Sequence, residues 1–116
     1  MSYPFENLQP EGLWKFFHDI TQIPRPSKKE EKIIAFLKEF GESRGLETIV
    51  DEIGNVLIRK PATAGMEDRK SVVLQSHMDM VCEKNSDIDF NFDTDAIIPR
   101  IEGEWIKATG TTLGAD

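Results

Sequence analysis

The segment Ser71-Val72-Val73-Leu74-Gln75-Ser76-His77-Met78-Asp79-Met80-Val81 decides which fold the sequence predicts. It opens with a short apolar run without turn residues, as in a strand buried on both faces of an α/β sheet. His77 and Asp79 follow two residues apart, so in extended backbone their side chains point to the same side. In open α/β sheets, ligands bind outside the carboxyl ends of the strands. The segment therefore predicts a buried strand that brings His77 and Asp79 to a ligand site.

Two interpretations of this histidine–aspartate pair are open. In the first, the imidazole binds a metal ion, and the carboxylate either accepts the other ring N–H or is itself a ligand. In the second, the two side chains form a buried polar pair with satisfied hydrogen bonds and bind nothing. The spacing of the two residues does not separate these interpretations, so the rest of the chain has to decide.

The composition predicts one globular domain and excludes several classes of partner. Of the 116 residues, 39% are hydrophobic and 30% are charged, which suffices for a core in a single domain. The net charge of −7 disfavours nucleic acid. No apolar run approaches the roughly 20 residues that span a membrane. Because no signal peptide is visible and the single cysteine, Cys82, forms no internal disulfide, a cytoplasmic location is expected.

The first predicted helix runs from Pro10 to about Thr21. Proline suits the first helical position, and apolar residues follow it at helical spacing. His18 lies on this helix and is interpreted as a structural or surface residue, since no partner lies nearby in sequence. The prolines of Ile23-Pro24-Arg25-Pro26 end the helix and force an extended connection.

The second predicted helix runs from about Lys28 to Arg44, with apolar residues along one face. Ser27 and Glu30 have the spacing of a capping box at its start. Gly45 stands where a left-handed C-terminal cap is expected.

The remaining elements are predicted to be hairpins and loops. Strands at 47–50 and 55–59 form one hairpin, and strands at 96–101 and 104–108 form another. The glycines of the segment 110–116 predict a tight turn with a close backbone approach.

The acidic segment between these hairpins has the residue spacing that begins a calcium-binding EF-hand loop. Its carboxylates and one amide recur at every second position, at Asp87, Asp89, Asn91, Asp93 and Asp95. Counted from either of the first two, the glycine and the glutamate that an EF-hand requires at its sixth and twelfth positions are missing. A solvated loop is the better interpretation.

Three segments of the chain resemble the PepD-type aminoacyl-histidine dipeptidases, also called cytosol non-specific dipeptidases, within the cocatalytic zinc peptidases. They are residues 54–67, residues 77–81 with the sequence His-Met-Asp-Met-Val, and residues 110–116 with the sequence Gly-Thr-Thr-Leu-Gly-Ala-Asp. The connection at 23–27 fits the same proteins. The resemblance covers essentially the whole chain and favours the metal interpretation of His77.

The resemblance implies a fold, a chemistry and a site. Residues 1–116 would form the N-terminal part of a three-layer α/β/α catalytic domain with a mixed sheet, two N-terminal helices and hairpins. His77 would bind one of two zinc ions, and Asp116 would bridge both. Asp79 would be the catalytic residue that orients or polarises His77. Zinc would activate water for hydrolysis of dipeptides such as aminoacyl-histidine.

The resemblance also implies that parts of the site lie outside this chain. In such enzymes a Glu-Glu pair beyond the residue that matches Asp116 supplies the general base and a zinc ligand, and a later acidic residue and a distant histidine complete the site. The chain is therefore expected to be a fragment, inactive alone, of an enzyme that forms a homodimer. Uncovered strand edges and apolar faces predict that the fragment self-associates.

Two alternative functions are open at this stage. An N-acyl amino acid deacylase of the same family would keep the zinc chemistry and change the substrate. A non-catalytic α/β fragment or interaction module would retain His77, Asp79 and Asp116 without a bound ion.

Overall fold

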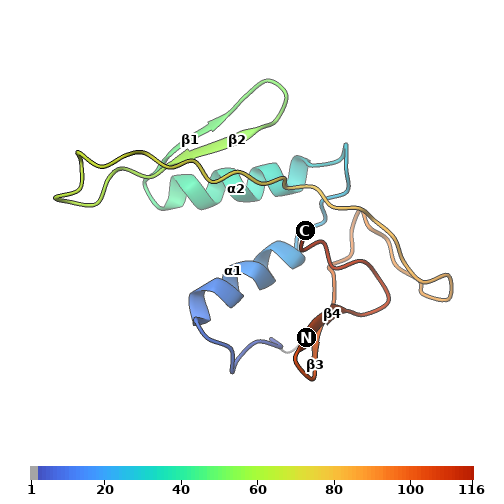
Figure 1. The fold of residues 1–116 in the computed structure, drawn as a ribbon. Coiled ribbons are helices and arrows are strands. Elements are labelled where there is room, and N and C mark those ends of the chain that lie inside the picture. Colours follow the sequence, from blue (N-terminus) through green and yellow to red (C-terminus); the bar gives the residue numbers. More distant parts are fainter. Residues whose placement is uncertain (1–2) are drawn as a thin grey trace. The chain divides into compact units, whose positions relative to one another are not determined.

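The structure is a computed structural model that describes residues 3–116 (Figure 1). Met1 and Ser2, which open the segment searched for a signal peptide, lie outside the described residues. Within the described range, two helices and four strands follow in the order α1–α2–β1–β2–β3–β4. The chain divides into two compact units: the first combines the chain up to Ile33 with Asp79–Asp116, and the second is Ile34–Met78. The predicted α/β composition, with two N-terminal helices and two hairpins, is confirmed.

The core of the first unit forms around helix α1, Glu11–Thr21, which begins one residue later than predicted. Phe5 is 1% exposed, and its ring centroid lies 5.7 Å from that of Trp14 and 5.9 Å from that of Phe17. His18 packs edge-on against Phe5 at a centroid distance of 6.0 Å. This aromatic contact agrees with the interpretation of His18 as a structural residue.

The end of α1 holds the segment that leads into the second hairpin. Ile97 is buried; its N–H donates to the carbonyl of Thr21 at 3.1 Å, and its carbonyl accepts from the Gln22 amide at 3.2 Å. Strand β3, Pro99–Glu102, then pairs antiparallel with β4, Trp105–Ala108. Both strands are edges of a two-stranded sheet, and an edge is where a strand tolerates a proline such as Pro99.

Helix α2 spans Glu31–Ser43, so it begins later than predicted. The predicted capping box is wrong. Ser27 lies too far before the helix to cap it, and its hydroxyl donates instead to Oδ2 of Asp79 at 2.5 Å. Lys28, next in the chain, has left-handed backbone with φ 69°. The end of the helix is as predicted, because Gly45 has φ 68° and closes the last turn.

The second unit places the first hairpin against α2. Strand β1, Glu47–Val50, pairs antiparallel with β2, Val56–Arg59, as the sequence predicts. Gly41 of the helix faces the hairpin, since a Cβ added there would clash with Oγ1 of Thr48 and lie 3.3 Å from Cδ1 of Ile58. Any larger residue at position 41 would push the hairpin away from the helix.

The buried strand predicted at residues 71–76 is wrong. The segment belongs to no strand of the described chain, and Val72, Val73 and Leu74 are 79%, 82% and 93% exposed. The physical reason is that a strand needs neighbours that accept and donate its backbone hydrogen bonds. The two sheets in residues 3–116 are both two-stranded hairpins that pair within themselves. Apolar composition alone therefore does not make this segment a strand here.

Asp51 sets the turn of the first hairpin, and the stability of that turn is expected to depend on pH. Its Oδ1 accepts the backbone N–H groups of Ile53, Gly54 and Asn55, at 2.8 to 3.0 Å. The side-chain amide of Asn55 donates to Oδ2 and is the largest cause that lowers the pKa of Asp51 below its ordinary value of 3.8. A lowered pKa means that the stabilisation is present above pH 3.8 and is lost as the pH falls through the lowered value.

The measurement is an NMR titration of the Asp51 carboxyl with amide exchange at Gly54 and Asn55. Exchange at both amides is expected to accelerate only as Asp51 becomes protonated. Asp51→Asn, which keeps an acceptor oxygen and removes the titration, is expected to abolish this pH dependence. Titration of Asp51 at or above its ordinary value would contradict the assignment.

Candidate functional site

Three segments of the first unit meet at Arg25, which is 5% exposed. Arg25 lies in the extended connection that the prolines predict, and this connection pairs with the 79–82 segment: Pro26 and Met80 form a parallel bridge, and the N–H of Met80 donates to the carbonyl of Arg25 at 3.0 Å. The guanidinium donates through Nη1 to the carbonyl of Asp79 at 3.4 Å and through Nη2 to the carbonyl of Gly114 at 2.5 Å.

Both predicted site carboxylates of this unit act on the same guanidinium. Burial lowers the pKa of Arg25, and the negative charges of Asp116 and Asp79, in that order, raise it. Arginine holds its charge under such conditions because its ordinary pKa is far above neutrality. The unit thus gathers a buried cation and two carboxylates at the place where the sequence predicts site residues.

Asp79 is half-buried, and its carboxylate accepts a hydrogen bond from a side chain. The exposed Ser27 hydroxyl donates to its Oδ2 at 2.5 Å, within the range of a charge-assisted bond. Ser27 and Arg25 therefore hold the side chain and the backbone of Asp79 respectively. Sequence reasoning missed both residues; the only signal was the proline-flanked connection in which they lie.

The C-terminal segment that carries Asp116 is held by backbone pairing. The Thr112 N–H donates to the carbonyl of Glu83 at 2.9 Å, and its hydroxyl donates to the carbonyl of Val81 at 2.7 Å. Gly114 has φ 71°, and a Cβ there would lie 2.6 Å from Nη2 of Arg25. The predicted tight turn with close backbone approach is confirmed.

Gly114→Ala is expected to destabilise the first unit by about 2–3 kcal/mol. The left-handed backbone costs an L-residue about 1–2 kcal/mol, and overpacking against Arg25 and Met80 adds about 1 kcal/mol or more. Urea unfolding followed by tryptophan fluorescence measures this, because both tryptophans of the chain, Trp14 and Trp105, belong to this unit.

Gly103→Ala is the matched control for this substitution. Gly103 also has positive φ, at 63°, but within residues 3–116 no atom beyond its two chain neighbours lies within 4 Å of an added Cβ. Only the backbone cost is therefore expected, about 1–2 kcal/mol. Equal losses in the two variants would show that the contact between Gly114 and Arg25 is not tight.

His77 is exposed and belongs to the second unit, whereas Asp79 and Asp116 belong to the first. It does not extend from a buried strand, because the segment before it is not one. The structure therefore brings Asp79 and Asp116 to one guanidinium, and the roles of His77, Asp79 and Asp116 toward a metal stay predictions.

Cys82 lies near Arg25 but has the character of a neutral thiol. Burial is the largest cause that raises its pKa, and the opposing effect of Arg25 does not overcome it. Its Sγ lies 3.6 Å from the carbonyl of Met80, to which it donates. A nucleophilic cysteine needs a lowered pKa, so Cys82 takes no such role here.

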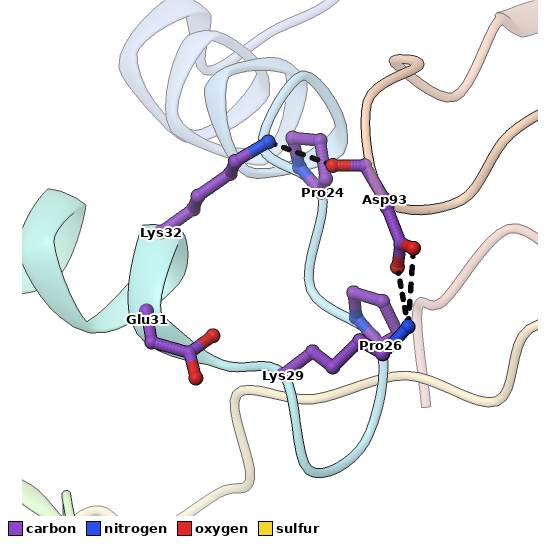
Figure 2. A pocket seen from close by; sticks show the side chains of 6 residues that line it. All are labelled: Pro24, Pro26, Lys29, Glu31, Lys32 and Asp93. Carbon is purple, nitrogen blue, oxygen red and sulfur yellow. Dashed lines mark hydrogen bonds and ion pairs between the residues drawn. The ribbon is translucent and has the colours of Figure 1, made fainter.

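A shallow depression of about 280 Å³ lies beside the site (Figure 2). Figure 2 shows that Lys29 and Lys32 reach across it to Asp93. Lys29 Nζ lies 3.1 and 3.0 Å from the two carboxylate oxygens of Asp93, and Lys32 Nζ donates to its carbonyl at 2.7 Å. These contacts join the acidic loop that contains Asp93 to the start of α2. The carboxylate of Asp93 therefore stabilises the fold.

The predicted metal ligands are of the types that zinc prefers. Zinc is bound by histidine nitrogen and carboxylate oxygen, and catalytic sites supply three protein ligands. His77 and Asp116 thus fit as part of a zinc site and do not complete one. Among residues 3–116, no group of three or more histidine, cysteine and acidic side chains is placed to hold a metal ion.

Two known dipeptidases are similar to this chain over nearly its whole length. The cytosol non-specific dipeptidase of Escherichia coli (strain K12) is 52% identical over 109 residues, which are 94% of this chain and 22% of that protein. The crystal structure of aminoacylhistidine dipeptidase from Vibrio alginolyticus matches 97% of this chain and 23% of that one, with 50% identity and a TM-score of 0.92. No protein-family model matches the chain.

These comparisons confirm the predicted resemblance to aminoacyl-histidine dipeptidases. The chain spans about a fifth of the length of either relative. The described fold, with two helices and two small antiparallel sheets, matches that part of a solved peptidase.

Proposed function

We propose that this chain is part of a zinc-dependent dipeptidase that hydrolyses dipeptides, aminoacyl-histidine among them, in the cytoplasm. The observation that carries the proposal is the 52% identity, over 109 residues, to a protein named cytosol non-specific dipeptidase. The backbone likeness to an aminoacylhistidine dipeptidase, with a TM-score of 0.92, agrees with it.

In this proposal residues 1–116 form the N-terminal part of a three-layer α/β/α catalytic domain with a mixed sheet. The exposed apolar run at Val72–Leu74 supports this placement. A segment of this composition is typical of a strand covered on both faces. It would become one when neighbouring strands satisfy its backbone.

The proposed site assigns one role to each of three residues. His77 and Asp116 would hold zinc, and Asp79 would orient His77. When bound, zinc polarises the scissile carbonyl and lowers the pKa of water. Asp79 suits its role because Ser27 already fixes its carboxylate at 2.5 Å, and a fixed carboxylate holds the ring of a ligating histidine in one orientation.

A chimera tests the proposal. The matching part of the E. coli dipeptidase is replaced by this chain, and hydrolysis of an aminoacyl-histidine dipeptide is measured before and after removal of metal by a chelator. We expect activity that is lost on chelation and restored by added zinc. A folded chimera that is inactive with zinc present would refute the proposal, and activity unaffected by chelation would refute its zinc dependence.

The isolated 116-residue chain is expected to be inactive, because two ligands do not complete a zinc site. The 116-residue chain is also expected to self-associate.

Val72, Val73 and Leu74 are largely exposed, and an unpaired apolar segment is a site for strand pairing between chains. Sedimentation at increasing concentration is expected to show species above 13.2 kDa, and a monomer throughout would contradict this. Val73→Lys is expected to weaken the association.

A further inference from the structure

Arg25 joins two segments that are far apart in the sequence. Its two terminal nitrogens donate to carbonyls of residues 54 and 89 positions away, at Asp79 and Gly114. One of these residues is a proposed site residue, and the other lies two positions before Asp116. Arg25 is buried, so the guanidinium has little room to take other positions.

We propose that Arg25 is a positioning residue that fixes the Asp79 segment relative to the Asp116 segment, with Ser27 as a second clamp on the Asp79 carboxylate. This inference rests on the proposed function, because it assigns Arg25 a role toward the proposed zinc site. Arg25 contacts neither substrate nor metal in it; it acts through the two carboxylate-bearing segments.

The geometry requires an arginine and not merely a cation. A planar guanidinium directs several N–H groups in fixed directions and can serve two carbonyls at once, whereas a lysine ammonium is a compact point charge. The chain makes room for the guanidinium with Gly114, where a Cβ would lie 2.6 Å from Nη2. The contact between Gly114 and Arg25 thus fixes the backbone that leads into Asp116.

The backbone pairing next to Arg25 supports the same assignment. Pro26 forms a parallel bridge with Met80, and the carbonyl of Arg25 accepts the N–H of Met80 at 3.0 Å. Arg25 therefore holds the 79–82 segment with its backbone and its side chain. Ser27, two positions on, adds the bond to the Asp79 carboxylate.

The test measures zinc affinity and steady-state kinetics of the chimera with Arg25→Met, Arg25→Lys and Ser27→Ala. Groups that orient metal ligands typically contribute about 10–100-fold in metal affinity or activity. We expect Arg25→Met to lower zinc affinity and kcat within that range with KM little changed. Arg25→Lys should recover only part of the loss, and Ser27→Ala should lower zinc affinity by up to about tenfold.

Two matched controls belong to the same unit. Arg100 donates to the carbonyl of Ala108 within the β3–β4 hairpin, so Arg100→Met removes an arginine–carbonyl bond that does not involve the site segments. Ser86 is exposed, and Ser86→Ala removes a hydroxyl elsewhere in the unit. Both are expected to leave zinc affinity unchanged.

The outcomes separate this inference from the proposed function. An unsubstituted chimera that neither binds zinc nor hydrolyses dipeptides refutes the proposed function. An active chimera whose folded Arg25→Met variant keeps its zinc affinity and kcat refutes the role of Arg25 alone. If Arg25→Met does not fold, the exposed Ser27→Ala and the conservative Arg25→Lys decide, and unchanged zinc affinity in both overturns the inference.

Discussion

His77→Ala in the chimera is expected to lower dipeptide hydrolysis by at least about a hundredfold, because a lost ligand costs no less than a lost orienting group. Imidazole nitrogen is a strong zinc ligand, and alanine offers no donor in its place. His77 is exposed, so the substitution leaves no cavity in the core. The measurement is kcat/KM for an aminoacyl-histidine dipeptide at saturating zinc.

His18→Ala is the control, since the chain contains only two histidines. His18 packs against the aromatic ring of Phe5, so its loss should reduce stability modestly and leave kcat/KM of the folded protein close to that of the unsubstituted chimera. Equal activity in the His77→Ala and unsubstituted chimeras would contradict the assignment of His77.

Phe5→Ala is expected to destabilise the first unit by about 3–5 kcal/mol, the usual cost of removing a fully buried aromatic ring. Phe5 is 1% exposed, and its ring is in contact range of Trp14, Phe17 and His18. The cavity left by alanine would be lined by rigid rings that do not close it easily. Since the free energy of unfolding of a whole domain is only about 5–15 kcal/mol, this substitution removes a large part of it.

Urea unfolding of the 116-residue chain measures this loss. Leu13→Ala serves as the control, because Leu13 lies on the same helix and is 53% exposed. It should cost less than about 1 kcal/mol. Similar losses in the two variants would show that Phe5 is not the centre of the core.

Local patterns predicted the elements that local interactions stabilise. Helix α2 followed from apolar residues at helical spacing and from Gly45, whose left-handed backbone ends it. Both hairpins followed from short strand-like runs on either side of a turn signal. In each case the residues that hydrogen-bond to one another lie within about a dozen positions in the sequence, so a short stretch of sequence contains both partners.

The prediction of a buried strand at 71–76 was wrong because burial of a segment depends on which other segments pack against it. Val72, Val73 and Leu74 have the composition of a buried strand, yet they are largely exposed. A strand exists only where other strands accept its hydrogen bonds, and the two sheets of the described residues are complete without it. The sequence pattern predicted that the segment 71–76 favours a strand. It did not predict whether a neighbouring strand is present to pair with it.

Arg25 and Ser27 show the same limit at the site. A local window assigned Ser27 to a helix cap, but its hydroxyl donates to Asp79, 52 residues away. Arg25 stands between two prolines and resembles a linker residue, while its partners lie 54 and 89 residues away. The sequence singled out the acidic residues Asp79 and Asp116 as site residues. It did not single out Arg25 and Ser27, which contact the segments that carry them, because those contacts are tertiary.

The zinc content of the chimera tests the central claim most directly. After metal removal and equilibration with zinc, the unsubstituted chimera should bind two ions per chain, as a cocatalytic site requires, and hydrolyse dipeptides. The double variant with His77→Ala and Asp116→Ala should lose bound zinc and activity together while remaining folded. Unchanged zinc content in that variant would show that neither residue is a ligand and would contradict the account.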